Sequence, residues 1–345
     1  MDLIHIRRHR LKLLFTFIAI GVAGGIAYGM TVTHLLGETK LFHGAIRGAF
    51  TGFVIAGLIS SFELFVVERP RGGLRSLPFL QLLAIKEVVY IAIILGGDWL
   101  GSTLFAIGDS SRFGFNNLTI MTFFFSIGSA LLINFIIEMS VLLGPGVLKD
   151  LIRGRYHRPR RERRLLVFFD MRGSTAIAEK IGDMAYHSLL NRFFIDLTEP
   201  VLASNGIVHK YVGDEMIVTW PLENGRDASG AYAAVLAARQ RFALLRDDYQ
   251  REFGVAPDFR AVLHAGEVIA GEMGEVKREI ALLGDTVNTT SKIEGVAKTL
   301  AEPVLASLDA LNAAVLPSGI RSRLLGSFSL PGKLAPVELH SIEAI

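Results

Sequence analysis

Long apolar runs in the first half of the chain and short, interrupted runs in the second half divide the sequence into two parts. Four runs approach the roughly 20 apolar residues that a helix needs to cross a bilayer. They cover about residues 11–30, 45–67, 77–95 and 118–143. Later apolar residues recur at the spacing of globular strands and helices. We therefore expect a transmembrane helical domain at 1–146, a basic coupling segment at 147–164 and a soluble domain at 165–345.

Basic residues beside these runs predict the orientation of the helices. They gather before the first run, between the second and third, and after the fourth: Arg7, Arg8, Arg10, Lys12, Arg69, Arg71, Arg75 and seven arginines between 153 and 164. The other two loops, 31–43 and 96–117, carry few. The positive-inside rule then predicts a multi-pass protein of the inner (plasma) membrane, with both termini and the soluble domain in the cytoplasm. No small-residue cleavage site follows the first run, so we expect it to be retained.

Composition and charge narrow the function classes. The 345-residue chain has a formal net charge of +3 and no cysteine, which excludes disulfides, Cys-based zinc sites and thiol nucleophiles. Because the basic residues cluster beside apolar runs, we interpret the charge as attraction to the lipid bilayer, and expect no nucleic-acid partner.

Two features of the membrane half have alternative interpretations. Ionisable or amide side chains interrupt the apolar runs at Glu63, Lys86, Glu87, Asn134 and Glu138. They form either a ligand or signal site, or polar contacts between helices. The arginine-rich segment 147–164 is either a coupling segment that transmits motion or a solvated flank held by anionic lipid.

Strand-like and helix-like segments alternate in the soluble half. The pattern predicts strands at 165–169, 207–211, 215–220, 259–265, 267–272, 281–284, 328–330 and 337–342, and helices at 176–181, 185–204, 228–253 and 287–298. Tight turns join several of the strands. This arrangement favours an α/β or α+β sandwich, in which helices cover a sheet, over a doubly wound parallel sheet.

Two acidic turns carry the candidate chemistry. The strand at 165–169 stops at Asp170, and Gly173 then opens a helix whose free N–H groups suit phosphate. A carboxylate beside them suits a hard metal ion. Asp214 lies at the tip of a predicted hairpin. Each signal is weak alone, because Asp and Gly are common in turns.

Four segments, in order, resemble the catalytic domain of class III adenylate and guanylate cyclases. They are residues 169–175, 210–215, 260–266 and 284–288. The resemblance covers about 164–345, and a multi-span anchor before this domain is similar to that of many bacterial members. It implies an N-terminal all-α transmembrane bundle of about four spans plus an α+β ferredoxin-like class III cyclase catalytic domain. It also implies a head-to-tail homodimer with active sites between the protomers.

The resemblance also implies which residues hold the metal ions and phosphates. Asp170 and Asp214 would bind two divalent cations, Mg²⁺ or Mn²⁺, with the Met171 carbonyl completing one coordination shell. The amides of Gly173, Ser174 and Thr175 would cradle phosphate. Arg260 and Lys333 match the cations that bind pyrophosphate.

Further matches concern the nucleoside. Lys210 corresponds to the lysine that reads adenine, and Asn288 to the asparagine that orients the ribose. Two positions depart from the family pattern. Ala281 stands where adenylate cyclases usually have an Asp or Thr acceptor for the adenine amino group. Lys292 replaces an arginine that stabilises the transition state, which keeps the charge but loses the planar fork.

We expect an adenylate cyclase that converts ATP to cyclic AMP and pyrophosphate. The alternatives are a guanylate or relaxed-purine cyclase, and a weak or silent membrane receptor with a cyclase-like module. Lys210 argues against guanine, whereas Ala281 weakens that argument. A diguanylate cyclase is excluded, because the hairpin at 212–216 lacks the Gly-Gly-Asp-Glu-Phe sequence of that class.

Overall fold

The computed structural model describes residues 2–35, 41–67, 77–105, 153–222, 228–276, 278–300 and 302–344, together with isolated positions between 74 and 150. The chain divides into two compact units, residues 1–139 and 140–345.

The first unit contains long apolar helices. They are α1 (Asp2–Leu35), α2 (Leu41–Phe62), the π-helical turn η1 (Glu63–Val67) and α3 (Phe79–Leu104). Three segments are long and apolar enough to cross a membrane, Leu14–His34, Leu41–Val67 and Phe79–Gly101. These match the first three predicted spans to within a few residues. The fourth, at 118–143, lies mostly outside the described residues.

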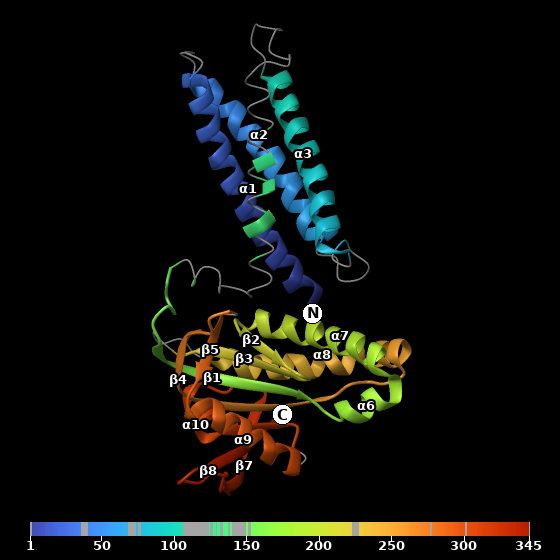
Figure 1. Cartoon of the computed structure of the whole chain (residues 1–345), viewed down its shortest axis with the longest axis vertical. Helices are drawn as coiled ribbons and strands as arrows, with labels where there is room; N and C mark the ends of the chain where they lie inside the picture. The colour runs from blue at the N-terminus through green and yellow to red at the C-terminus, as the bar shows by residue number, and fades with distance from the viewer. Residues whose placement is uncertain are drawn as a thin grey trace. The chain divides into compact units, whose positions relative to one another are not determined.

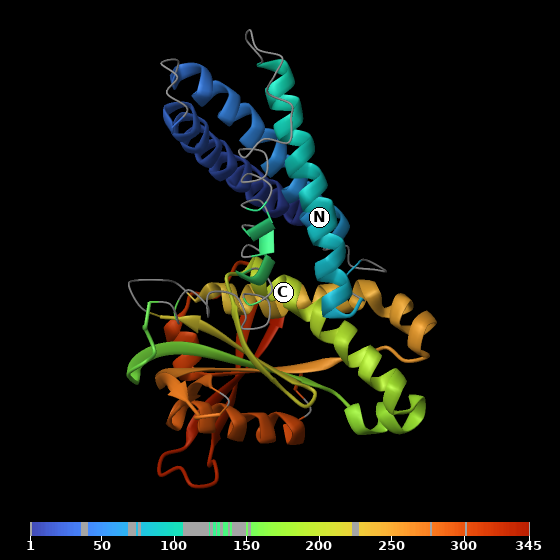
Figure 2. The same cartoon turned by 45° about the horizontal axis from the view of Figure 1, so that its top comes forward.

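Glycines bring α1 and α2 into close contact, side by side in both Figure 1 and Figure 2. A Cβ atom at Gly25 would lie 2.1 Å from the carbonyl oxygen of Gly48, and one at Gly29 equally close to that of Gly44. Glycine is therefore required at this crossing, as at other tight helix pairs in membranes.

The polar side chains of the membrane half contact one another. Lys86 Nζ lies 3.1 Å from Glu63 Oε1, and Asn134 donates to Glu87 at 2.9 Å. Both contacts join residues distant in sequence, which supports the helix-packing interpretation. The fifth predicted polar residue, Glu138, lies outside the described residues.

The second unit is built around one mixed sheet. Its elements are β1 (Arg160–Met171), α6 (Ser174–Ile181), α7 (Asp183–Ala203), β2 (Ile207–Val212), β3 (Glu215–Pro221), α8 (Ser229–Phe253), β4 (Phe259–Met273), β5 (Glu279–Leu283), α9 (Asp285–Leu300), β6 (Val304–Ser307), α10 (Leu308–Ala313), β7 (Ile320–Phe328) and β8 (Val337–Ala344). The strand order is β2-β3-β1-β4-β6-β8-β7, and β5 pairs with β4. The β4–β6 pair is parallel and the others are antiparallel.

Helices cover both faces of this sheet. Helices α7 and α8 lie on one face and α9 on the other (Figure 1). The central strand β1 is buried on both sides, since Val167 and Phe169 belong to the core under α7 and α8 while Leu166 and Phe168 belong to the opposite core. A strand buried on both faces reads as a continuous apolar run, which explains why it was easy to predict.

The structure differs from the sequence-based expectation in three places. Strand β1 begins at Arg160, inside the segment predicted to be a basic connector, because the buried Arg164 pairs with Glu162. Strand β4 continues through Gly266, where a break was predicted. The sequence analysis did not predict β6, α10 or most of β7.

Candidate active site

The end of β1 lies beside the β2–β3 hairpin. The strand carries Asp170, and the hairpin turn carries Asp214, the two aspartates predicted to bind metal. Asp170 is opposite Glu215 of β3 and Arg260 of β4 in the sheet register. The amide of Met171 donates to the carbonyl oxygen of Asp214 at 3.4 Å. Gly213, with a φ of +60°, permits the tight turn that places Asp214 there.

Two cations contact the carboxylate of Asp170. Arg260 Nη1 and Lys298 Nζ lie 3.5 Å and 3.6 Å from the same oxygen, Oδ2. Burial nevertheless raises the pKa of Asp170, and the negative charges of Glu294 and Asp214 add to that effect. The two cations therefore do not fully offset burial and the neighbouring carboxylates, which favours the binding of a further cation.

Two more carboxyl groups in this cluster were missed by the sequence analysis. Glu294 of α9 is buried and pairs with Lys298 one helical turn later. Burial and a hydrogen bond with Glu294 raise the pKa of Glu215 to about 8. Glu215 directly follows Asp214 in the motif, which was a usable signal. The Glu294 contact depends on how α9 packs, so no local pattern indicated it.

The predicted phosphate-binding turn opens α6. Gly173 adopts a left-handed conformation with φ +67° as the residue before the helix. Nothing lies within 4 Å of the position of a Cβ atom there, so space around the turn is open. The side chain of Ser174 forms a hydrogen bond with Tyr186 of α7. Burial and the negative charge of Asp214 raise the pKa of Tyr186. Gly173, Ser174 and Thr175 thus present a helix N-terminus near the carboxylates.

The first turns of α9 carry a second group of predicted residues. Lys333, in the β7–β8 hairpin, forms an ion pair with Asp285. This contact and the nearby charge of Lys292 lower the pKa of Asp285. The Lys292 ammonium would lie 3.6 Å from a Cβ atom at Gly332. Asn288 is exposed. This end of α9 therefore gathers two lysines beside a free amide.

The residues predicted to read the base lie on β2 and β5. Lys210 is exposed and faces Ile217 across a β-bulge that contains His209. Ala281 is buried opposite Gly271 of β4. Lys210 and Glu279 both influence the pKa of His209, although β2 and β5 are not paired in the sheet. Ala281 has no side-chain acceptor for the adenine amino group. Among the described residues, no contact at this position supplies one in its place.

The predicted residues thus form two groups rather than one site. We name Asp170, Met171, Asp214 and Arg260 the carboxylate half-site, and Lys210, Ala281, Asn288, Lys292 and Lys333 the nucleoside half-site. Along α9, ten residues separate Asn288 from Lys298, which is about 15 Å at 1.5 Å per residue. A polar cavity of about 540 Å³ is lined by Asp285 and Lys333, and neither Asp170 nor Asp214 lines it.

Comparison with known proteins decides which family this arrangement represents. The profile of the adenylate and guanylate cyclase catalytic domain matches residues 158–340, more than half of the chain. The chain belongs to the class III nucleotide cyclases. Its cyclase domain therefore begins close to the start of β1, several residues before the predicted boundary at 165.

Two curated relatives are adenylate cyclases. The chain is 34% identical over 210 residues to adenylate cyclase 2 of Rhizobium meliloti (strain 1021), and 27% identical over 184 residues to adenylate cyclase 1 of the same organism. These matches cover 61% and 52% of this chain, but 58% and 27% of the relatives. A bacterial light-regulated adenylyl cyclase has a similar fold, with a TM-score of 0.54, 19% identity and coverage of 66% of this chain and 67% of that one.

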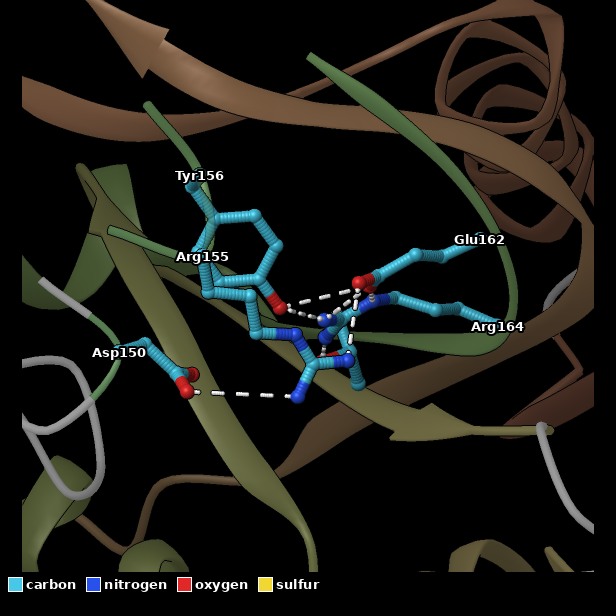
Figure 3. Close-up of polar contacts among 6 residues, drawn as sticks. Asp150, Arg155, Tyr156, Glu162 and Arg164 are labelled. Atoms are coloured by element: carbon cyan, nitrogen blue, oxygen red, sulfur yellow. Dashed lines mark hydrogen bonds and ion pairs between the residues drawn. The ribbon is translucent and has the colours of Figure 1, made fainter. Parts of the chain in front are cut away.

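Within this cyclase, the basic segment before β1 is part of the catalytic unit. Arg164 donates to Glu162 at 2.6 Å and to Thr219 at 2.8 Å, and all three side chains are buried. Arg155 and Tyr156 approach the same Glu162 carboxylate (Figure 3). Although burial opposes it, Arg164 holds the pKa of Glu162 below its ordinary value. These arginines are therefore not simply a solvated flank.

Proposed function

We propose that this protein is a membrane-anchored adenylate cyclase that converts ATP to 3′,5′-cyclic AMP and pyrophosphate at a homodimer interface. The observation that carries the proposal is the division of the predicted residues into two half-sites. Asp170 and Asp214 lie together at one end of β1, while Asn288 and Lys292 lie in the first half of α9. In a two-fold symmetric dimer, the nucleoside half-site of one copy can face the carboxylate half-site of the other.

The carboxylate half-site fits two divalent cations held jointly by protein and substrate. Among the described residues, no three His, Asp or Glu side chains converge as a complete metal cage. Mg²⁺ is commonly held by one or two carboxylates together with substrate phosphates, so Asp170 and Asp214 are a sufficient protein contribution. The Met171 carbonyl is a further oxygen ligand. When bound, such ions would lower the pKa of the ribose hydroxyl and neutralise charge on the triphosphate.

The protein's own residues orient the nucleotide. The ribose 3′-oxygen attacks the α-phosphorus, the bond to the bridging oxygen breaks, pyrophosphate leaves, and the hydroxyl proton passes to solvent. Asn288 orients the ribose, and Lys292 stabilises negative charge on the α-phosphate. Arg260 and Lys333 bind the leaving pyrophosphate, with the amides of residues 173–175. Lys333 must exchange its ion pair with Asp285 for one with phosphate.

Base selectivity rests mainly on Lys210. A lysine donates to adenine N1, whereas the corresponding nitrogen of guanine carries a proton and prefers an acceptor. Ala281 provides no side-chain acceptor for the adenine amino group, so selection against GTP is incomplete. A relaxed-purine or guanylate cyclase is the second candidate, and the structural reason for retaining it is the buried methyl group at position 281.

The membrane half is proposed to anchor the enzyme in the inner membrane, with both termini and the catalytic domain in the cytoplasm. Residues 147–164 would couple the two halves. Tyr156 belongs to the same buried cluster as Leu282 of β5, which is next to Ala281. Val287, next to Asn288, packs against this cluster. Arg155 and Tyr156 of this segment contact Glu162 of β1 (Figure 3). Displacement of the segment would therefore disturb the nucleoside half-site directly.

The test is an assay of the purified full-length protein in detergent or lipid vesicles. ATP and GTP are supplied separately with Mg²⁺ or Mn²⁺, and the product is identified by mass spectrometry. We expect cyclic AMP from ATP, formed faster than cyclic GMP from an equal concentration of GTP. Cyclic GMP at an equal or higher rate would establish the relaxed-purine or guanylate alternative. No cyclic nucleotide from a folded dimer, under any of the four conditions, would refute the proposed enzyme.

A further inference from the structure

One cation at the carboxylate half-site belongs to none of the motifs that identify the family. Lys298 lies on the last turns of α9, and its ammonium is 3.6 Å from Asp170 Oδ2 and 2.5 Å from Glu294 Oε1. The side chains of Asp170 and Glu294 are 8% and 10% exposed, whereas that of Lys298 is 50% exposed. A flexible, half-solvated cation therefore covers two buried carboxylates.

The charge of Lys298 has a strong effect on Asp170. Burial and neighbouring carboxylates raise the pKa of Asp170, and among the charges that oppose this, Lys298 is the largest, ahead of Arg260. Lys298 is itself held in the charged form. Although partial burial opposes it, the hydrogen bond to Glu294 and the charge of Asp170 raise its pKa. The ammonium thus supplies positive charge where the proposed metal ions would bind.

Arg260 and Lys298 contact the same carboxylate oxygen but differ in mobility. Arg260 extends from the middle of the sheet, directly opposite Asp170, and its side chain is 17% exposed. Lys298 reaches the oxygen from a helix end by a long, flexible stem that loses little by turning into solvent. An incoming divalent ion would therefore displace Lys298 rather than Arg260.

We propose that Lys298 is a tethered counter-ion, which neutralises Asp170 and Glu294 in the metal-free enzyme and leaves when a divalent cation binds. This proposal rests on the proposed function in one respect, since it requires that Asp170 binds a metal ion. It makes Lys298 a positioning residue that keeps the carboxylates in place between catalytic cycles. It also means that metal binding competes with an internal cation, which weakens the apparent metal affinity.

The competition can be measured without nucleotide and without turnover. Full-length protein in detergent is titrated with Mn²⁺, and the free ion is quantified by electron paramagnetic resonance. Lys298→Met removes the charge at similar length, and Lys298→Arg keeps the charge. Lys180→Met is the matched control, because Lys180 also lies in the last turn of a helix but bonds to the carbonyl of Gly254. Asp170→Asn reports whether the observed site contains Asp170.

We expect Lys298→Met to bind Mn²⁺ about 3- to 30-fold more tightly than the wild type, as for a partly exposed charge at this distance. Lys298→Arg and Lys180→Met should resemble the wild type. Without metal, Lys298→Met should unfold at a lower temperature, and saturating Mn²⁺ should reduce that difference.

The outcomes separate the two levels of the proposal. One outcome is that Asp170→Asn abolishes Mn²⁺ binding while folded Lys298→Met binds Mn²⁺ as well as the wild type or more weakly. This outcome overturns the counter-ion role of Lys298 but supports Asp170 as a metal ligand. Unchanged Mn²⁺ binding in Asp170→Asn instead refutes the metal assignment itself. If Lys298→Met does not fold without metal, Lys298→Gln replaces it, and wild-type affinity in that variant overturns the counter-ion role equally.

Discussion

Asp170 and Asn288 occupy opposite ends of the region covered by α9, and their surroundings differ. Asp170 is buried and contacts Lys298 and Arg260 within the same chain. Asn288 is exposed, and its neighbour Lys292 lies beside the β7–β8 hairpin, where its charge helps to lower the pKa of the exposed Asp285. Buried charges require internal partners, whereas exposed groups remain available for a ligand or a second protein chain.

The difference explains how one helix contributes to two sites. The second half of α9 covers the carboxylate half-site of its own chain through Glu294 and Lys298. The first half presents Asn288 to solvent and places the half-buried Lys292 beside the β7–β8 hairpin. If the nucleotide binds between two copies, each α9 contributes to both active sites. Its second half contacts the carboxylates of its own chain, and its first half faces the carboxylates of the other copy. The following predictions test this comparison, beginning with the largest expected effect.

Loss of either metal-binding aspartate should nearly abolish cyclisation. We expect Asp170→Ala and Asp214→Ala each to lower kcat by about 1000-fold or more, equivalent to about 4 kcal/mol of transition-state stabilisation. The measurement is steady-state cyclic AMP formation by each purified variant. Asp247→Ala, an exposed position on α8, is the control and should retain activity. Near-normal turnover by Asp170→Ala, in a preparation free of wild type, would contradict the metal assignment.

Mixing variants from different half-sites should restore activity. Asp214→Ala and Asn288→Ala are each defective, but a heterodimer of the two contains one intact site. With random exchange of protomers, recovery should reach about a quarter of wild-type activity, since half the dimers carry one good site of two. The measurement is cyclic AMP formation after co-expression with two different affinity tags.

The matched control combines two lesions in the same half-site. A heterodimer of Asp170→Ala and Asp214→Ala contains no intact site, so it should stay inactive. Recovery in this control, or its absence in a purified heterodimer of Asp214→Ala and Asn288→Ala, would contradict a site shared between chains.

Lys292 should contribute to catalysis more than to binding. Lys292→Ala should lower kcat by about 10- to 1000-fold, as for the loss of one electrostatic donor. Lys292→Arg should raise kcat with little change in KM, because a guanidinium can contact two oxygens of the α-phosphate. Steady-state kinetics of the three proteins provide the measurement. An alanine variant with wild-type kcat would show that Lys292 is merely a solvated helix residue.

Local signals in the sequence predicted where Asp170 and Asp214 lie in the fold. Asp170 ends an apolar strand, and Asp214 occupies a hairpin turn marked by Gly213. The sequence also located three apolar helices from run length alone. The residues of the nucleoside half-site were predicted from the family resemblance alone. Whether they form one site with the carboxylates of a second copy is not tested by the structure of a single chain.

Contacts made across the fold could not be predicted locally. Lys298 and Asp170 are brought together by the packing of α9 against β1, and Glu294 had no motif to mark it. The arginines between residues 160 and 164 resembled a solvated flank. Glu162 is recognisable as the partner of Arg164 only when this segment is known to be a strand, which places both side chains on one face. Such pairings depend on strand register, which the sequence of one strand does not specify.

The smallest expected effect concerns stability at the edge of the nucleoside half-site. Burial, assisted by the charges of Lys210 and Arg164 and opposed by Glu279, lowers the pKa of His209 to about 4. An unfolded chain binds a proton at this residue near pH 6.5, so the native state loses stability as the pH falls from 6.5 toward 4, by about 1 to 3 kcal/mol. Urea unfolding followed by Trp220 fluorescence in a Trp99→Phe background measures this loss. His209→Gln should reduce the slope with pH, whereas the exposed His187→Gln should retain it; equal slopes in both variants would contradict burial of a neutral His209 beside Lys210.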